Sequence, residues 1–253
     1  MRAVEIHPLH GIGEVRPGHD LGDLFIEALG TANIDPKTDD ILVVTSKILS
    51  KAEDRFVDLN NVVPGAEARR LAAITLKDPR IVELALGESS EVVRAAPNIL
   101  ILRHRLGLVM ANAGIDQSNL GPGGEELVLL LPLDPDSSAA ILHQRLTKHW
   151  GGGPAVIISD SFGRPWRHGV INVAIGASGL PTLVDRRGEP DRDGRILTTT
   201  QIALGDMVAT AAGLVCGEGA ESVPAALVRG YVCPPGDLPA STLVRPATQD
   251  LFR

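Results

Sequence analysis

The sequence predicts an α+β or mixed α/β fold, and three observations lead to this prediction. The chain of 253 residues is long enough to bury a sizeable core, either as one large domain or as two lobes without a clear linker. Its residues are 44% hydrophobic and only 3% aromatic, so the core must consist mostly of Leu, Val, Ile and Ala. Apolar strand patterns and helical patterns alternate, but without the even spacing of a doubly wound parallel sheet.

The first third of the chain contains two strands and three helices by pattern. The segment over residues 2–21 begins with a short alternating strand and continues as a loop rich in Gly and Pro. Asp20 is suited to cap a helix over residues 21–32, whose apolar positions recur at helical spacing. The β-branched run 41–44 predicts a buried strand, and residues 64–87 predict two helices separated near a proline.

The remaining two thirds continue this alternation. Residues 98–121 return to strands before a Gly-, Asn- and Asp-rich loop, and a helix is predicted to begin near Asp136. Residues 155–158 read as a buried strand that ends before Asp160. Residues 198–232 predict a long amphipathic helix, a loop and a last strand.

Composition excludes several classes of protein. The formal net charge of -7 argues against a general nucleic-acid binder, which would need a basic surface. Cys216 and Cys233 are too few for a disulfide framework, and no Cys/His spacing suggests structural zinc. The polar N-terminus lacks the apolar segment of a signal peptide, and no run approaches the roughly 18 apolar residues of a membrane span. We therefore expect a cytoplasmic protein with no membrane partner.

Polar segments, most of them containing glycine, follow several of the predicted elements. None matches a phosphate-binding P-loop or a Gly-x-Gly-x-x-Gly dinucleotide fingerprint, so a P-loop nucleotidase and a dinucleotide-dependent dehydrogenase are both unsupported. The loops are HGIGEVRPG, TSKILSK, NAGIDQSN, SDSFGRPWRHG and CGEGAES.

Two aspartates in these loops are candidate ligands of a hard cation. Asp116 and Asp160 both follow apolar segments, and Ser161 and Glu218 could complete a site of oxygen ligands. Mg²⁺ and Mn²⁺ prefer such ligands and are usually held by one or two carboxylates together with substrate phosphates. The alternative is structural: Asp116 would form an Asx-turn and Glu218 would simply be solvated.

Basic residues in two loops are candidate anion binders. Lys47 and Lys51 would share one helical face, where they could meet a polyphosphate or form a solvated helix end. Arg164 and Arg167 flank Trp166, so they could bind a carboxylate or phosphate bidentately, or belong to an exposed loop anchored by the tryptophan.

No side chain stands out as a covalent nucleophile. The Gly-x-Ser-x-Gly elbow of Ser/His/Asp hydrolases is missing. Cys216 lies near the end of an apolar helix and is better interpreted as a small buried residue. His7 and His10 flank a proline in a loop, and we interpret them as incidental.

Considered together and in order, the loops resemble those of the coenzyme F420-0:L-glutamate ligase family. The resemblance covers nearly the whole chain, in the form without an additional flavin-binding domain, and implies a single domain over residues 1–253 with a two-lobed α+β fold and an intertwined homodimer. The segments that carry it are RPGHDL, VVTSKILSKAE, RLGLVMANAGIDQSN, LLPLDPDSSA, IISDSFGRPWRHG, AIGASGL and PAALVRG.

The resemblance implies roles for matching positions. Asp116 and Asp160 would hold one Mg²⁺ or Mn²⁺, Ser161 and Glu218 would contribute to a second, and K⁺ is an optional further cation. Lys51 would add positive charge for catalysis, and from local chemistry Arg164 or Arg167 would hold an acidic substrate. The residues expected to contact GTP are Ile12, Gly13, Glu14, Val15, Ser46, Lys51, Asn119, Gly217, Gly219, Ala220, Glu221, Ser222 and Val223.

The implied reaction transfers the γ-phosphoryl group of GTP to the carboxylate of F420-0, and the amine of L-glutamate then attacks the acyl phosphate. Such phosphoryl transfer needs positioning and charge neutralisation rather than a protein nucleophile. The chain departs from many members at Ile171 and Asn172, where they carry Thr-Asp, and at Met207, where they carry Glu. Two alternatives therefore stay open: a diverged ligase with a different acid as acceptor, and a GTP-binding protein without turnover.

Overall fold

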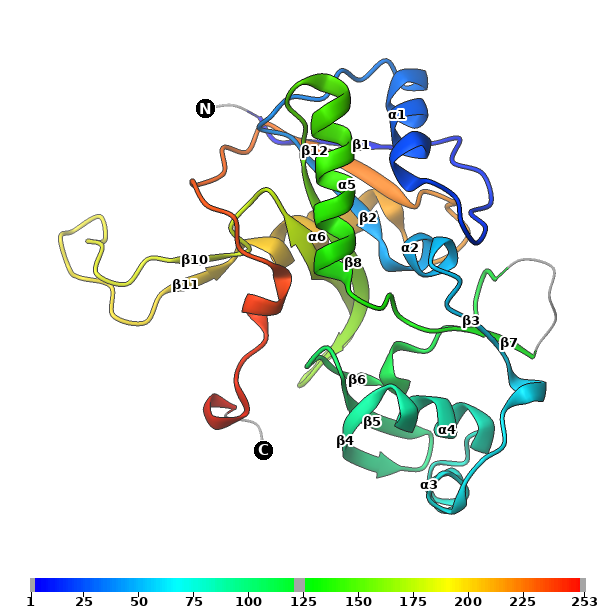
Figure 1. Ribbon diagram of the computed structural model, residues 1–253. Helices are drawn as coiled ribbons and strands as arrows, with labels where there is room; N and C mark the ends of the chain where they lie inside the picture. The colour runs from blue at the N-terminus through cyan, green and yellow to red at the C-terminus, as the bar shows by residue number, and fades with distance from the viewer. Residues whose placement is uncertain (1–2, 121–125, 251–253) are drawn as a thin grey trace.

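A five-stranded mixed sheet forms the centre of the protein in the computed structural model, which describes residues 3–120 and 126–250 (Figure 1). The central pair β2 and β8 is parallel, and every other neighbouring pair is antiparallel. The strand order is β1 (Glu5–Pro8), β12 (Ala225–Arg229), β2 (Ile41–Thr45), β8 (Ala155–Arg164) and β9 (Arg167–Ser178).

Helices cover both faces of this sheet, because its central strands are apolar on both sides. Leu42 and Val44 of β2 belong to the same hydrophobic cluster as residues of α1 and α5, whereas Ile41 and Val43 pack with α6. This alternation follows from the two-residue period of a strand. The covering helices are α1 (Leu21–Thr31), α2 (Ser46–Ala52), α5 (Pro135–Trp150) and α6 (Leu204–Cys216). We call the sheet and these helices the main body.

Aspartates begin the two longest helices of the α1/α5 face. Asp20 caps α1 by accepting a hydrogen bond from the Asp23 N–H, as predicted, and Asp134 caps α5 through the Ser137 N–H. Helix α5 therefore begins at Pro135, one residue before the predicted start, because proline suits the first helical position.

A second, smaller unit packs its own hydrophobic core. Its sheet contains β4 (Ser89–Ala96), β5 (Ile99–His104) and β6 (Val109–Ala111), and the two predicted helices are α3 (Ala66–Thr75) and α4 (Pro79–Gly87). Buried leucines of α3 and β5 meet Val82 of α4 in this core. We call these five elements the small unit.

Shorter elements connect the two parts or extend from them. The strands β10 and β11 form a narrow arm that projects from the main body (Figure 1). These elements are β3 (Phe56–Asp58), η1 (Leu59–Asn61), η2 (Asn112–Gly114), β7 (Leu127–Leu129), β10 (Leu183–Asp185), β11 (Gln201–Ala203), η3 (Ala240–Leu243) and η4 (Ala247–Gln249).

The predicted mixed α/β organisation is confirmed, but two element boundaries were wrong. Strand β8 does not end before Asp160; it continues to Arg164, because β9 folds back as a hairpin and pairs with it along this extension. Helix α6 begins only at Leu204, because residues 201–203 pair with β10 instead. Among the described residues, no helix is both long and apolar enough to cross a membrane.

Candidate functional site

A large cavity lies between the main body and the small unit. Its volume is about 2280 Å³, and its walls come from α2, the β8–β9 hairpin, the β5–β6 strands, the loop after α6 and the C-terminal segment. Pockets for one small ligand are typically about 300–1000 Å³. The cavity therefore has room for more than one substrate.

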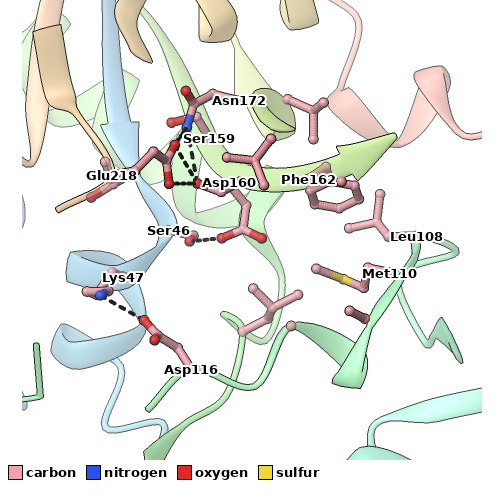
Figure 2. A pocket seen from close by; sticks show the side chains of 18 of the residues that line it. Ser46, Lys47, Leu108, Met110, Asp116, Ser159, Asp160, Phe162, Asn172 and Glu218 are labelled. Carbon is pink, nitrogen blue, oxygen red and sulfur yellow. Dashed lines mark hydrogen bonds and ion pairs between the residues drawn. The ribbon is translucent and has the colours of Figure 1, made fainter. Parts of the chain in front are cut away.

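Asp160 is placed in this cavity by the parallel strand pair. Thr45, the last residue of β2, pairs with Ser159 of β8, so Asp160 lies just beyond the point where β2 becomes helix α2. The Ser46 hydroxyl at the start of α2 donates a hydrogen bond of 2.6 Å to Asp160 Oδ1 (Figure 2). The carboxyl ends of parallel strands are where α/β proteins commonly bind ligands.

Burial, together with the nearby charges of Asp116 and Glu218, raises the pKa of Asp160 to about 6 against the opposing effect of the Ser46 hydrogen bond. Within the described chain, Asp160 has no Lys, Arg or His partner within ion-pair distance. The charged form of this carboxylate is thus poorly compensated by the protein itself.

Asp116 reaches the cavity from the segment after η2. Its carboxylate forms an ion pair of 2.8 Å with Lys47 Nζ and accepts hydrogen bonds from the Ser118 N–H and hydroxyl, both at 2.8 Å. Burial opposes ionisation, but Lys47 and Ser118 outweigh it and lower the pKa of Asp116. Asp116 therefore forms the Asx-turn predicted as its structural alternative, and the same carboxylate also pairs with Lys47.

Glu218 and Ser161 meet on the other side of Asp160. The Ser161 hydroxyl donates to the Glu218 carboxylate, with distances of 2.9 and 2.7 Å to its two oxygens. The Asn172 amide donates to Glu218 Oε1 at 3.2 Å (Figure 2). It also donates to the Ser161 oxygen at 3.4 Å. Glu218 is therefore bound within the site rather than simply solvated.

Lys51 links three of the loops singled out in the sequence. Its side chain is only 5% exposed, and its ammonium group pairs with the Glu14 carboxylate and donates to the Asn119 carbonyl at 2.9 Å. The Asn119 amide donates in turn to the Gly219 carbonyl at 3.4 Å. A buried ammonium needs such partners, and these contacts hold the loops at one side of the cavity.

The structure brings almost all of the predicted site residues to one cavity. Glu221 is the exception, since it does not line the cavity and its carboxylate accepts a hydrogen bond of 2.7 Å from the Gly219 N–H. The predicted residues that line it are Ile12, Gly13, Glu14, Val15, Ser46, Lys51, Asp116, Asn119, Asp160, Ser161, Arg164, Arg167, Gly217, Glu218, Gly219, Ala220, Ser222 and Val223.

The acidic residues fit a cation only in combination with other oxygen ligands. Among residues 3–120 and 126–250, no three His, Cys, Asp or Glu side chains are close enough to hold a metal ion by themselves. The poorly compensated Asp160, the adjacent carboxylates and the Ser161 hydroxyl nevertheless form an oxygen-rich set suited to Mg²⁺ or Mn²⁺ together with phosphate oxygens.

The arginines predicted to bind anions lie at the tip of the β8–β9 hairpin. Arg164 donates to the His168 carbonyl at 3.2 Å through one terminal nitrogen, and its buried Nε has no hydrogen-bond partner in the described structure. Trp166 occupies the turn with φ of 63° and is 75% exposed, so it does not anchor the loop in a core. The alternative of a buried tryptophan anchor was wrong.

Other interpretations of single residues can also be checked. Cys216 is 8% exposed, as predicted, and burial raises the pKa of its thiol to about 11, which makes it an unreactive cysteine. Arg94 of β4 and Phe162 of β8 line the cavity, although no sequence argument selected them. The hairpin signal around Pro97 and Asn98, between two β-branched runs, could have indicated the strand that carries Arg94.

The cavity has carboxylates at the end of a parallel strand pair, is lined by lysines and arginines, and is larger than one ligand needs. These features define the site of an enzyme that acts on anionic substrates. A family model described as F420-0:Gamma-glutamyl ligase matches residues 11–230. The chain belongs to the F420-0:gamma-glutamyl ligase family.

Curated relatives agree over nearly their full length. The chain is 42% identical to the coenzyme F420:L-glutamate ligase of Methanopyrus kandleri, over 99% of this chain and 98% of that protein. It is 43% identical to the protein of the same name from Methanothermobacter thermautotrophicus, over 97% of each chain. The corresponding protein of Haloarcula marismortui is 42% identical over 90% of this chain and 88% of its own length.

Proposed function

We propose that this protein joins L-glutamate to F420-0 through a γ-glutamyl amide bond, with GTP as the source of energy. Family membership supports the reaction class and the two substrates. The observation that carries the use of a triphosphate with a cation is Asp160, an acidic group in a substrate-sized cavity that has neighbouring carboxylates and no cationic partner among the described residues.

The chemistry proceeds in two steps. A carboxylate oxygen of F420-0 attacks the γ-phosphorus of GTP, so that a P–O bond forms to the acceptor and GDP leaves. The amine of glutamate then attacks the acyl carbon, inorganic phosphate leaves with the C–O bond electrons, and the amine loses a proton. The protein contributes positioning and charge neutralisation, and neither step needs a covalent protein intermediate.

Residues of the chain have distinct roles in this proposal. Asp116, Asp160, Ser161 and Glu218 would hold Mg²⁺ or Mn²⁺, which supplies neutralisation of the phosphate charge when bound. Lys51 orients the nucleotide loops by its contacts with Glu14 and Asn119. The proposed nucleotide contacts are the cavity residues Ile12, Gly13, Glu14, Val15, Ser46, Lys51, Asn119, Gly217, Gly219, Ala220, Ser222 and Val223.

Two of the three sequence departures do not contribute to the described lining of the cavity. Ile171 and Met207 are not among its described lining residues, and Met207 is 62% exposed on α6. Asn172 does line it, but its amide is engaged by Glu218. These placements favour F420-0 as the acceptor over a different carboxylic acid.

Incubation of the protein with F420-0, L-glutamate, GTP and Mn²⁺, followed by mass spectrometry and nucleotide analysis, tests the proposal. We expect a mass increase of one or more glutamyl units, with one GDP released per unit added. GDP release only with another acid would establish the diverged ligase, and GTP binding without GDP release under any acceptor would establish a non-catalytic protein.

We further propose that the main body and the small unit are two lobes of one domain and that the protein is an intertwined homodimer, as the family resemblance implies. Size-exclusion chromatography with light scattering tests the assembly. A mass near 53 kDa, about twice the 26.7 kDa of the chain, is expected, whereas a mass of one chain would contradict it.

A further inference from the structure

The part of the cavity farthest along β8 from Asp160 has a different chemical character from the acidic cluster. Asp160, Phe162 and Arg164 alternate along β8 with the more exposed Ser161 and Gly163, and all five residues line the cavity. At a strand rise of ~3.3 Å per residue, Arg164 lies about 13 Å along β8 from Asp160. The wall thus passes from a carboxylate to an aromatic ring and then to a guanidinium group.

Arg94 of the small unit lines the same cavity because of an irregular strand pairing. The register of β4 against β5 shifts between Val92 and Arg94, and both Val93 and Arg94 are lining residues. Consecutive residues of a regular strand point to opposite faces, so this bulge turns an additional side chain towards the cavity. Bulges often serve to redirect a side chain near a functional site.

Several cationic groups here lack a partner in the described structure. The guanidinium groups of Arg94 and Arg167 have no hydrogen bond or ion pair with any described residue. Arg164 Nε is buried without a partner. In contrast, the cavity-lining Arg103 pairs with Glu91 and Asp250. Unpaired arginines in a cavity are suited to bind an anionic ligand group.

The hairpin tip also offers an exposed aromatic surface. Trp166 lines the cavity while remaining 75% exposed, and it stands between Arg164 and Arg167 with a positive φ of 63°. A bulky residue in this backbone region is uncommon and costs conformational energy. Tryptophan with flanking arginines is suited to stack on a planar ring and to neutralise its negative charge.

We infer that Trp166, Arg167 and Arg94 form a binding subsite for a planar, negatively charged ring system of the acceptor. The subsite lies at the hairpin end of the cavity, next to Arg164, which is about 13 Å along β8 from Asp160. This inference rests on the proposed function, because the acceptor must extend along β8 with its carboxylate at the acidic cluster. The subsite selects the acceptor, and it contributes to neither the nucleotide nor the cation contacts.

Titration calorimetry with F420-0 and, separately, with GTP and Mn²⁺ tests the subsite. We expect Trp166→Leu and the double variant Arg94→Gln/Arg167→Gln each to weaken F420-0 binding at least 10-fold, while GTP affinity changes less than 2-fold. Arg195→Gln is the matched control, since Arg195 is an exposed arginine of the arm outside the cavity lining. Unchanged F420-0 affinity in both subsite variants would overturn the inference.

A fluorescence measurement tests whether F420-0 binds next to Trp166 or elsewhere on the protein. Trp150 and Trp166 are the two tryptophans of the chain, so a Trp150→Phe protein reports on Trp166 alone. F420-0 should quench this emission and GTP should not. If F420-0 binds without changing it, only the subsite is overturned; if F420-0 does not bind the wild-type protein at all, the proposed function is overturned together with the subsite.

Discussion

Two carboxylates, Glu88 and Asp160, differ in how the protein compensates their charge. Glu88 follows the last residue of α4 in the small unit. Its carboxylate lies 2.9 Å from Arg55, 3.3 Å from Arg105 and 3.4 Å from His104. Burial opposes ionisation of Glu88, but the two arginines outweigh it and lower its pKa. Among the residues that the structure describes, Asp160 has only the Ser46 hydroxyl as a side-chain partner, and burial raises its pKa to about 6.

This difference separates a structural cluster from a ligand site. A compensated carboxylate contributes to the fold, whereas an uncompensated one beside Asp116 and Glu218 costs stability until a cation or another ligand arrives. Perturbed acids in clefts are commonly functional for this reason. Replacing Asp160 and Glu88 should consequently have opposite effects on stability and activity.

The largest effect is expected for Asp160→Asn. The amide can still accept the Ser46 hydrogen bond but cannot support a bound cation, so glutamate ligation should fall by about 100- to 1000-fold. At pH 7 without ligands the variant should be more stable by about 1–3 kcal/mol, since a pKa raised by burial reports a cost of charging the native state. Activity assays and calorimetric unfolding check the two parts, and wild-type turnover would remove Asp160 from the mechanism.

Glu88→Gln should have the reverse pattern. It leaves Arg55 and Arg105 without their shared carboxylate, so the free energy of unfolding should decrease by about 2–4 kcal/mol while folded protein keeps its turnover number at 25 °C. Urea denaturation provides the measurement. Glu67→Gln in the exposed pair with Arg70 is the control and should leave the midpoint unchanged. Equal midpoints for wild type and Glu88→Gln would contradict a structural role.

A smaller effect concerns acid stability and His104. Burial lowers the pKa of this fully buried histidine from 6.5, and Arg105 adds to the shift against the opposing charge of Glu88. Below about pH 6.5, His104 therefore binds a proton in the unfolded chain but not in the native state. Its contribution to the free energy of unfolding is fully present above this pH and is lost as pH falls towards the native pKa. The lowered pKa of Glu88 adds a loss of the same sign below about 4.5.

The test compares wild type with His104→Asn by urea denaturation between pH 7 and 5. The wild-type stability should decline by up to about 1.4 kcal/mol per pH unit more steeply than that of the variant. Parallel profiles would show that His104 does not titrate between the two states in this way.

Much of the site could be predicted from the sequence because its residues lie in short polar segments that follow apolar runs, although some of these segments belong to β8 and α2 rather than to loops. The residue pattern alone did not predict that Asp116, Asp160 and Glu218 line one cavity, because they are far apart in the sequence. The family resemblance led to that prediction. The extension of β8 to Arg164 could not be derived from residues 155–158, since its pairing with β9 is a tertiary effect. Arg94 was missed because β4 is mostly exposed and shows no clear alternation.

The most direct test of the ligand-binding role of Asp160 is thermal unfolding of the wild-type protein and of Asp160→Asn. Each protein is measured without ligands and with GTP and Mn²⁺ together. We expect the wild-type midpoint to rise by several degrees at ligand concentrations about 100 times the dissociation constant, where binding contributes about 2.7 kcal/mol. The variant should show little or no rise. Equal rises in both proteins would contradict the claim that the uncompensated charge of Asp160 is there to hold a ligand.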